Sequence, residues 1–147
     1  MKISTKGRYG LRALVDLAVN SNGEHVALSE IADRQNISMN YLEQVFASLR
    51  KAGLINSVKG AQGGYIFAKS PSSITVGDVL RVLEGNLSLA DDSKGNFDEK
   101  SVEYCLKTMV WDRMENVINE FVDSIAIEDL ANEYRRINGN ESSMYYI

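Results

Sequence analysis

Residues 37–69 read ISMNYLEQVFASLRKAGLINSVKGAQGGYIFAK, a predicted helix followed by a predicted β-hairpin. Ser38 is a suitable N-cap for the helix, and Gly53 is placed to end it. The helix has a predicted buried face of four apolar residues at helical spacing, Leu42, Val45, Phe46 and Leu49. Two short strand-like runs, LINSV and YIFA, then flank a glycine-rich connection, which is typical of a hairpin.

Two further helices are predicted before this segment and one after it. Apolar spacing predicts helices over residues 5–20 and 28–36, and Thr75 with Asp78 matches a capping box that opens a fourth helix. Three helices followed by a hairpin is the order of a winged helix-turn-helix, in which the third helix reads DNA. The sequence therefore predicts a mainly α fold with a small β-hairpin wing, and a winged helix-turn-helix domain over residues 1–84.

The rest of the chain is predicted as a linker and a separate helical extension. Residues 85–100, GNLSLADDSKGNFDEK, are polar and broken. A long amphipathic helix is predicted over about residues 101–124, and at ~1.5 Å per residue it would be on the order of 36 Å long. A short closing helix completes a region over residues 101–136, and residues 137–147 are predicted as a tail. Because so long a helix overreaches the core of a small domain, we expect it to pair with a second copy of the chain.

Charge is distributed unevenly along the 147 residues, whose net charge is −4. Residues 1–69 contain nine Lys or Arg and five Asp or Glu, whereas residues 70–147 contain seven and fifteen. This asymmetry predicts a basic working face and an acidic, solubilising segment. Arg12 and Asp16 interrupt the apolar stretch that a signal peptide would need, and no run reaches the roughly 18 apolar residues of a membrane span. We therefore expect a cytoplasmic protein with no membrane partner.

The outward face of the predicted third helix carries side chains suited to DNA. Asn and Gln make bidentate contacts to adenine, Glu accepts a hydrogen bond from cytosine, and Lys suits a phosphate. The candidate residues are Asn40, Tyr41, Glu43, Gln44, Ser48 and Lys51. Any surface helix turns polar residues outward, so the helix by itself leaves both interpretations open.

The hairpin loop, KGAQGGY, is a second candidate DNA contact. Its three glycines permit positive φ and close approach to a sugar-phosphate edge, and Lys59 is placed to reach a minor groove. The alternative is an ordinary hairpin that needs glycine to turn, although three glycines in five positions exceed what a turn requires. The loop glycines are Gly60, Gly63 and Gly64, and the basic residues that complete the predicted face are Lys6, Arg8 and Arg12.

Three stretches, MKISTKGRYGLRAL, the segment 37–69 and ITVGDVLRVLEG, resemble the Rrf family of bacterial winged-helix regulators. The resemblance is close over residues 1–85, and EDLANEY is similar to the closing helix of that family. It implies a homodimer on a palindrome-like double-stranded operator. The positions that match the family's major-groove contacts are Ser38, Asn40, Tyr41, Glu43 and Gln44. Lys59 stands where the family often has arginine, and lysine fits a minor groove less well.

Many members of that family hold an iron–sulfur cluster on three cysteines, and this chain departs from that pattern. Cluster ligation needs several thiolates, whereas Cys105 is the single cysteine and Arg8 occupies the position of the N-terminal ligand. We therefore expect no cofactor and no metal site. Cys105 is expected to be a small buried apolar residue at the dimer contact, or alternatively a reactive, redox-sensing thiol. The lone histidine, His25, is expected to be solvated in a polar turn.

The chain closes on an apolar tail, MYYI, after the polar run INGNESS. Similar cluster-free repressors of cysteine metabolism act with a cysteine synthase that accepts peptides ending in isoleucine, so the resemblance implies that Tyr146 and Ile147 dock into such an enzyme. The alternative is a tail packed on its own dimer. The predicted function is a dimeric repressor of cysteine or sulfur metabolism genes. The alternatives are a thiol redox regulator and a subunit that acts mainly on an enzyme. No nucleophile–base pair or phosphate loop indicates an enzyme.

Overall fold

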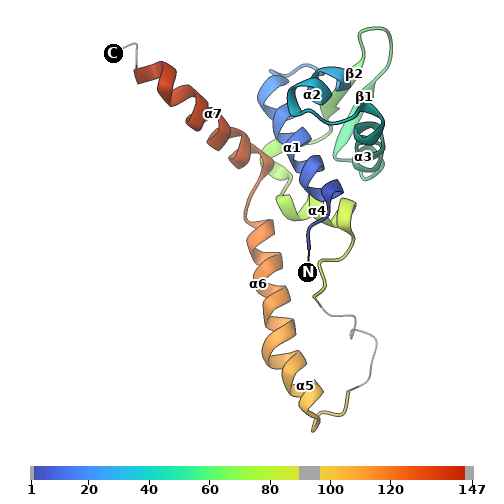
Figure 1. Ribbon diagram of the computed structural model, residues 1–147, viewed down its shortest axis with the longest axis vertical. Coiled ribbons are helices and arrows are strands. Elements are labelled where there is room, and N and C mark those ends of the chain that lie inside the picture. The colour runs from blue at the N-terminus through green and yellow to red at the C-terminus, as the bar shows by residue number, and fades with distance from the viewer. Residues whose placement is uncertain (1, 90–96, 145–147) are drawn as a thin grey trace.

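The computed structural model describes residues 2–89 and 97–144, and its N-terminal part is a small helical domain with one hairpin (Figure 1). The hairpin strands pair antiparallel, with Ile55 opposite Phe67 and Val58 opposite Gly64. The elements are α1 (Thr5–Asn20), α2 (Leu28–Gln35), α3 (Met39–Lys51), β1 (Ile55–Val58), β2 (Gly64–Phe67), the 3₁₀ turn η1 (Pro71–Ser73) and α4 (Val76–Glu84). The predicted mainly α fold with a small hairpin is confirmed.

The core of this domain is built from the apolar stripes of the helices and from the first residue of β1. Leu14 of α1, Phe46 of α3 and Ile55 of β1 are fully buried. Residues from the C-terminal part of the chain also enter this core, because Ile127 and Ala131 are fully buried among the same cluster. The C-terminal helix therefore completes the core of the N-terminal domain.

The predicted long helix is present, with one irregular turn inside it. It comprises α5 (Val102–Leu106), the π-helical turn η3 (Lys107–Trp111) and α6 (Asp112–Asp123). The backbone stays in the right-handed helical region at both junctions, so the three elements form one continuous helix. It projects away from the winged-helix domain (Figure 1).

The last helix, α7, spans Ile127–Met144 and is longer than the predicted closing helix, which ends at residue 136. The prediction of a tail from residue 137 rests on the polarity of INGNESS. Polarity does not prevent a solvent-exposed helix, and the segment contains no proline to stop one. Within the described residues, no helix is long and apolar enough to cross a membrane. The two tail residues with a predicted partner, Tyr146 and Ile147, lie outside the described residues.

The junction between α6 and α7 is fixed to the start of α4. The Val76 amide donates to the Ile125 carbonyl at 2.8 Å, and the Ile127 amide donates to the Ile74 carbonyl at 2.8 Å. Arg81 of α4 also pairs with Asp123 at the end of α6, with N–O distances of 2.7 and 2.9 Å. The hydrogen bond from Arg81 lowers the pKa of Asp123 below its ordinary value of 3.8. These contacts set the direction of the projecting helix relative to the N-terminal domain.

Candidate nucleic-acid interface

Helix α3 has one face in the core and the opposite face in solvent. The buried face consists of Leu42, Val45, Phe46 and Leu49, as the apolar spacing predicts. The open face carries four of the predicted DNA contacts, Asn40, Glu43, Gln44 and Lys51, and all four are exposed. A duplex laid along this face would therefore meet an amide pair, a carboxylate and an ammonium group, which are the groups that read base edges and phosphates.

Ser38 and Tyr41 also have structural roles at the start of α3. The Ser38 hydroxyl oxygen accepts a hydrogen bond from the Tyr41 amide at 3.2 Å, which makes Ser38 the N-cap that the sequence predicts. The half-buried Tyr41 ring packs edge-to-face against Tyr9 of α1, with ring centroids 5.9 Å apart. Both residues thus orient the N-terminal turn of α3, the end of a recognition helix that meets base edges.

The glycines of the hairpin loop are explained by contacts inside the chain. Gly60 has φ +118°, a conformation that side-chain-bearing residues rarely adopt. A Cβ atom at Gly63 would lie 2.2 Å from the Val58 carbonyl oxygen, and one at Gly64 would lie 2.2 Å from the Val26 carbonyl oxygen. The excess of glycine therefore has an intramolecular cause, and Lys59 is left as the exposed charged side chain beside the turn.

Three contacts that the sequence did not indicate hold the wing against the helices. Val26 and Tyr65 exchange two backbone hydrogen bonds of 2.9 Å, which adds a one-residue bridge to the edge of the hairpin. The exposed His25 donates from Nε2 to the Gln62 carbonyl oxygen at 2.6 Å, so it contacts the wing loop rather than solvent alone. At the C-terminal end of α3, Arg50 donates a hydrogen bond to the hydroxyl of Ser57 in β1 at 3.3 Å. The wing therefore has a fixed position beside α3.

The N-terminal end of α1 is capped by a residue from α4. One carboxylate oxygen of Glu84 accepts hydrogen bonds from the Ser4 and Gly7 amides, both at 3.0 Å. A carboxylate at this position satisfies free amides and complements the helix dipole. The predicted DNA contacts Lys6 and Arg8 lie in this same turn, half-buried and exposed respectively.

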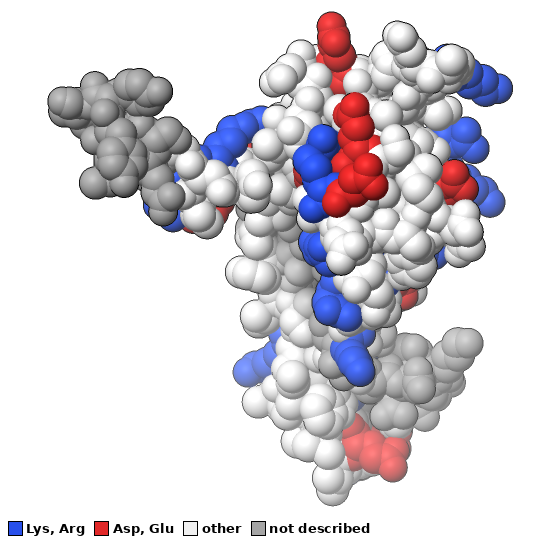
Figure 2. Space-filling model, turned by 45° about the horizontal axis from the view of Figure 1, so that its top comes forward, with Lys and Arg blue, Asp and Glu red and all other residues white. Residues whose placement is uncertain are grey.

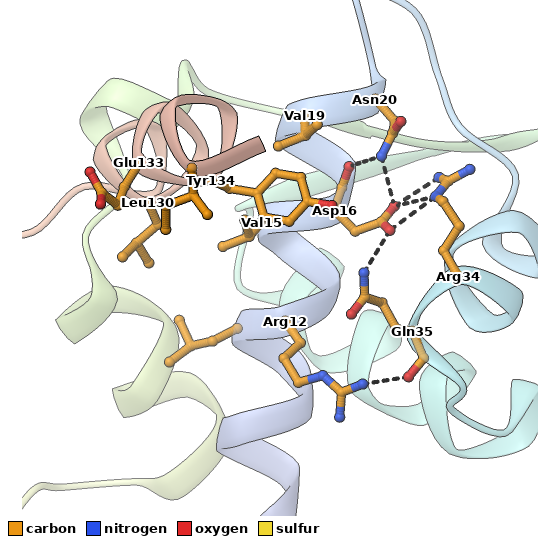
Figure 3. Close-up of a pocket in the computed structure, with 12 residues that line it drawn as sticks. Arg12, Val15, Asp16, Val19, Asn20, Arg34, Gln35, Leu130, Glu133 and Tyr134 are labelled. Carbon is orange, nitrogen blue, oxygen red and sulfur yellow. Dashed lines mark hydrogen bonds and ion pairs between the residues drawn. The ribbon is translucent and has the colours of Figure 1, made fainter. Parts of the chain in front are cut away.

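A buried carboxylate fixes α2 against α1. Asp16 of α1 has 5% of its surface exposed. Its carboxylate oxygens accept hydrogen bonds from the Arg34 guanidinium at 2.8 and 3.0 Å and from the Gln35 side-chain amide at 2.9 Å. Asn20 adds a longer hydrogen bond of 3.4 Å. The hydrogen bond to Asp16 raises the pKa of Arg34 above its ordinary value. Figure 3 shows these four residues, which we call the Asp16 clamp, converging between α1 and the end of α2.

A pocket of about 710 Å³ lies between the Asp16 clamp and α7 (Figure 3). Arg12 lines the pocket, and its guanidinium makes contacts within the chain: it donates a hydrogen bond to the Gln35 carbonyl and lies over the Tyr9 ring, 5.0 Å from the ring centroid. The α7 side is formed by Leu130, Tyr134 and Ile137 together with the charged Glu133, and Tyr134 is 51% exposed there. The C-terminal helix α7 therefore lies across the pocket from the Asp16 clamp, which joins α1 to α2.

Basic side chains are exposed on the N-terminal domain, with acidic side chains among them (Figure 2). Figure 2 shows Lys and Arg side chains along the edge formed by α3 and the wing, and a second series down the middle of the face. The described basic residues of the N-terminal half that face solvent include Arg8, Arg50, Lys51 and Lys59. Such a surface favours the phosphate backbone of a nucleic acid.

These features agree with a match to a known protein family. Residues 3–133 match the Rrf2 family, described as an iron-dependent transcriptional regulator. The chain belongs to the Rrf2 family. It is a transcriptional regulator of the DNA-binding type rather than an enzyme, because its relatives are named as regulators.

Two curated Rrf2 relatives and one solved structure illustrate the similarity. The chain is 41% identical over 147 residues to the HTH-type transcriptional regulator CymR of Bacillus subtilis, covering 100% of both chains. It is 37% identical over 132 residues to IscR of Escherichia coli, covering 90% of this chain and 81% of that protein. The solved structure of CymR, described as the global cysteine regulator of B. subtilis, has a TM-score of 0.77 and 40% identity, covering 90% of this chain and 98% of that one.

The described residues do not fit the iron site that the Rrf2 description implies. No group of three His, Cys, Asp or Glu side chains is gathered for a metal in the described part of the chain. Cys105 is exposed on α5 of the isolated chain, and Arg8 near the N-terminus is a cation that cannot ligate iron. No step of the function is therefore assigned to a metal or cluster.

Proposed function

We propose that this Rrf2 protein is a homodimeric repressor that binds a palindrome-like operator through α3 and the wing. The main support is the geometry of α3, whose buried face is anchored while Asn40, Glu43 and Gln44 point to solvent. Lys51 adds a phosphate contact from the end of α3, and Lys59 reaches toward a minor groove from the wing. One such domain reads only a half-site, so a two-fold pair would read an inverted repeat. The site of action is the cytoplasm, where bacterial DNA is found.

We assign the regulated genes to cysteine or sulfur metabolism. The support is the similarity along the whole chain to B. subtilis CymR, a protein described as a global cysteine regulator. The direct experiment is a mobility shift with promoter fragments of cysteine and sulfur genes and of unrelated genes, at a fixed salt concentration. We expect retardation of the first group at protein concentrations that leave the second group free. Equal retardation of both groups would contradict the assignment.

The proposed partner is a cysteine synthase bound through Tyr146 and Ile147, as the resemblance to cluster-free repressors implies. The test is a titration of purified cysteine synthase with the full chain and with a variant that lacks these two residues. Binding that is lost in the shortened variant supports the partner. Equal binding of both forms would place the contact elsewhere, and tight enzyme binding without any DNA binding would favour an enzyme-regulating subunit instead.

We propose that regulation proceeds without an iron–sulfur cluster. The support is the donor set, since the described residues hold one thiol and no group of three His, Cys, Asp or Glu side chains gathered for a metal. Protein purified under strict exclusion of oxygen should show no visible absorbance beyond the protein background. A cluster absorbance band with matching iron and sulfide content would contradict this.

A thiol-based signal is the second candidate, because the structure leaves Cys105 exposed on α5. Thiol oxidation requires access, and access is present in the isolated chain. If the thiol carries the signal, oxidant should change operator affinity in the wild type and leave the Cys105→Ser variant unchanged. An identical oxidant response in both proteins would eliminate this candidate.

A further inference from the structure

The wing ends in a loop, residues 59–63, that extends beyond the last paired residues of the hairpin (Figure 1). Val58 and Gly64 form that last pair, and the loop residues from Lys59 to Gln62 are exposed. Within the loop, the Gly63 amide donates to the Gly60 carbonyl at 3.0 Å, which closes one turn. The position of Lys59 therefore depends on what holds this turn against the rest of the domain.

A side chain from outside the wing holds the loop. The His25 imidazole donates from Nε2 to the Gln62 carbonyl oxygen at 2.6 Å. In the described part of the chain, no other side chain forms a hydrogen bond with residues 59–63. Val26, the next residue after His25, exchanges two backbone hydrogen bonds with Tyr65. One short segment thus binds the base of the wing through its backbone and the loop through the imidazole.

The direction of this hydrogen bond defines which substitutions preserve it. A carbonyl oxygen only accepts, so Nε2 of His25 carries the proton, either in the neutral Nε2–H tautomer or in the imidazolium ion. The contact therefore requires a donor at that position but no charge. The amide nitrogen of a glutamine reaches about as far from the backbone as Nε2 does and can replace it, whereas a phenylalanine of similar size offers no donor.

The His25 contact orders the loop before DNA is bound. A free loop loses conformational freedom when it binds, and a loop that is already ordered loses less. The ordered loop leaves the Lys59 ammonium as its exposed charged group. A narrow, A·T-rich minor groove has an enhanced negative potential that attracts such a cation. Because Arg50 also ties α3 to β1, the position of Lys59 is set relative to the recognition helix.

We propose that His25 is a positioning residue for DNA recognition: its hydrogen bond to the Gln62 carbonyl holds the wing loop so that Lys59 enters the minor groove beside the half-site read by α3. The consequence is a preference for A·T base pairs at that flank, at positions that α3 does not contact. This inference rests on the proposed operator binding and adds a specificity-determining residue that lies outside both α3 and the hairpin.

The order of the loop can be measured in the free protein by ¹⁵N relaxation of the backbone amides. We expect order parameters near the value of about 0.85 for rigid backbone at Gly60 and Gly63 in the wild type and in His25→Gln, and clearly lower values in His25→Phe. The Tyr65 amide, which is held by Val26, should stay rigid in all three proteins. A loop that is equally ordered in His25→Phe would overturn the inference.

Binding of the full chain to two duplexes tests the effect on specificity. Both carry the motif that the wild type selects from random DNA, and they differ only in A·T or G·C pairs at the flank. The wild type and His25→Gln should prefer the A·T flank at least about fivefold, and His25→Phe less than about twofold. Discrimination against base changes within the α3 half-site and the urea midpoint should not change. A retained flank preference in His25→Phe, or an equal loss of discrimination at the α3 positions, would overturn the inference.

A double variant tests whether His25 acts through Lys59. Lys59→Ala should abolish the flank preference, and adding His25→Phe should then change affinity by less than about twofold, because both residues serve one contact. The matched control is Glu24→Gln, at the adjacent exposed position, which should keep the flank preference. Losses that multiply in the double variant would overturn the inference. A wild type that selects no motif would contradict the proposed operator binding itself, whereas the loop order in the free protein tests the His25 contact independently.

Discussion

Neutralising Asp16 should destabilise the protein far more than neutralising another acid that pairs with the same arginine. Asp16 and Glu30 both face Arg34, at 2.8 and 3.9 Å. The Asp16 side chain is 2% exposed, whereas the Glu30 side chain is 61% exposed. The variants Asp16→Asn and Glu30→Gln therefore compare a buried carboxylate with a solvated one at nearly constant side-chain volume.

The magnitude follows from what each substitution leaves behind. Breaking a buried ion pair costs about 3–5 kcal/mol when the remaining charge stays unpaired in the interior. Arg34 is 38% exposed and can be partly solvated, and asparagine still offers one acceptor, so we expect Asp16→Asn to cost about 2 kcal/mol. Glu30→Gln removes only a solvated pair and should cost less than about 0.5 kcal/mol.

Urea unfolding of the protein at one fixed concentration, followed by circular dichroism, measures both costs. Operator affinity in the absence of urea should also fall for Asp16→Asn, because the Asp16 clamp orients α2 beside the recognition helix. Equal losses of unfolding free energy for Asp16→Asn and Glu30→Gln would show that the clamp does not carry the energy assigned to it.

Three further predictions concern the DNA face, the wing and the domain junction. Gln44→Ala should cost about 1–3 kcal/mol of binding free energy at particular bases, whereas Lys51→Ala should weaken binding to all duplexes alike. Lys51→Ala should also reduce the slope of log affinity against log salt concentration by about one, and a loss of sequence discrimination in this variant would contradict the assigned face. Gly64→Ala should destabilise the fold by about 2 kcal/mol in urea unfolding, because its Cβ would meet a backbone oxygen at 2.2 Å, and an unchanged midpoint would contradict the docked wing. Carboxyl NMR should find the pKa of Asp123 below 3.8 in the wild type and closer to 3.8 in the Arg81→Gln variant. The stability that this pair contributes is present above pH 3.8 and is lost as the pH falls through the folded-state pKa. An Asp123 pKa that does not respond to Arg81→Gln would exclude the pair.

The local parts of the fold could be predicted because their signals are local. Ser38 caps α3, the apolar stripe from Leu42 to Leu49 sets its buried face, and glycine marks the hairpin turn. The predicted length of α7 is too short because polarity alone does not distinguish a tail from a solvent-exposed helix. The role of the loop glycines depends on a contact, between Gly64 and the Val26 carbonyl, that joins residues far apart in sequence.

Other features depend on tertiary contacts and left weaker signals. Asp16 lies among the buried residues Leu14, Leu17 and Ala18 of α1, and an acid on a buried face requires a partner, although the sequence does not say which one. Glu84 caps α1 by accepting a hydrogen bond from Gly7, which lies 77 positions earlier in the sequence, and no local spacing reveals this contact. The π-helical turn at Lys107–Trp111 was not predicted, because apolar periodicity alone predicts a regular helix there.

The proposed function requires that two copies of this chain read one inverted repeat through α3. Selection of bound fragments from random duplex DNA by the full chain, followed by sequencing, tests it most directly. We expect an enriched motif of two inverted half-sites, with a changed base preference at matching positions of both half-sites in Gln44→Ala. Enrichment of no motif, or of a single half-site that Gln44→Ala leaves unchanged, would contradict it.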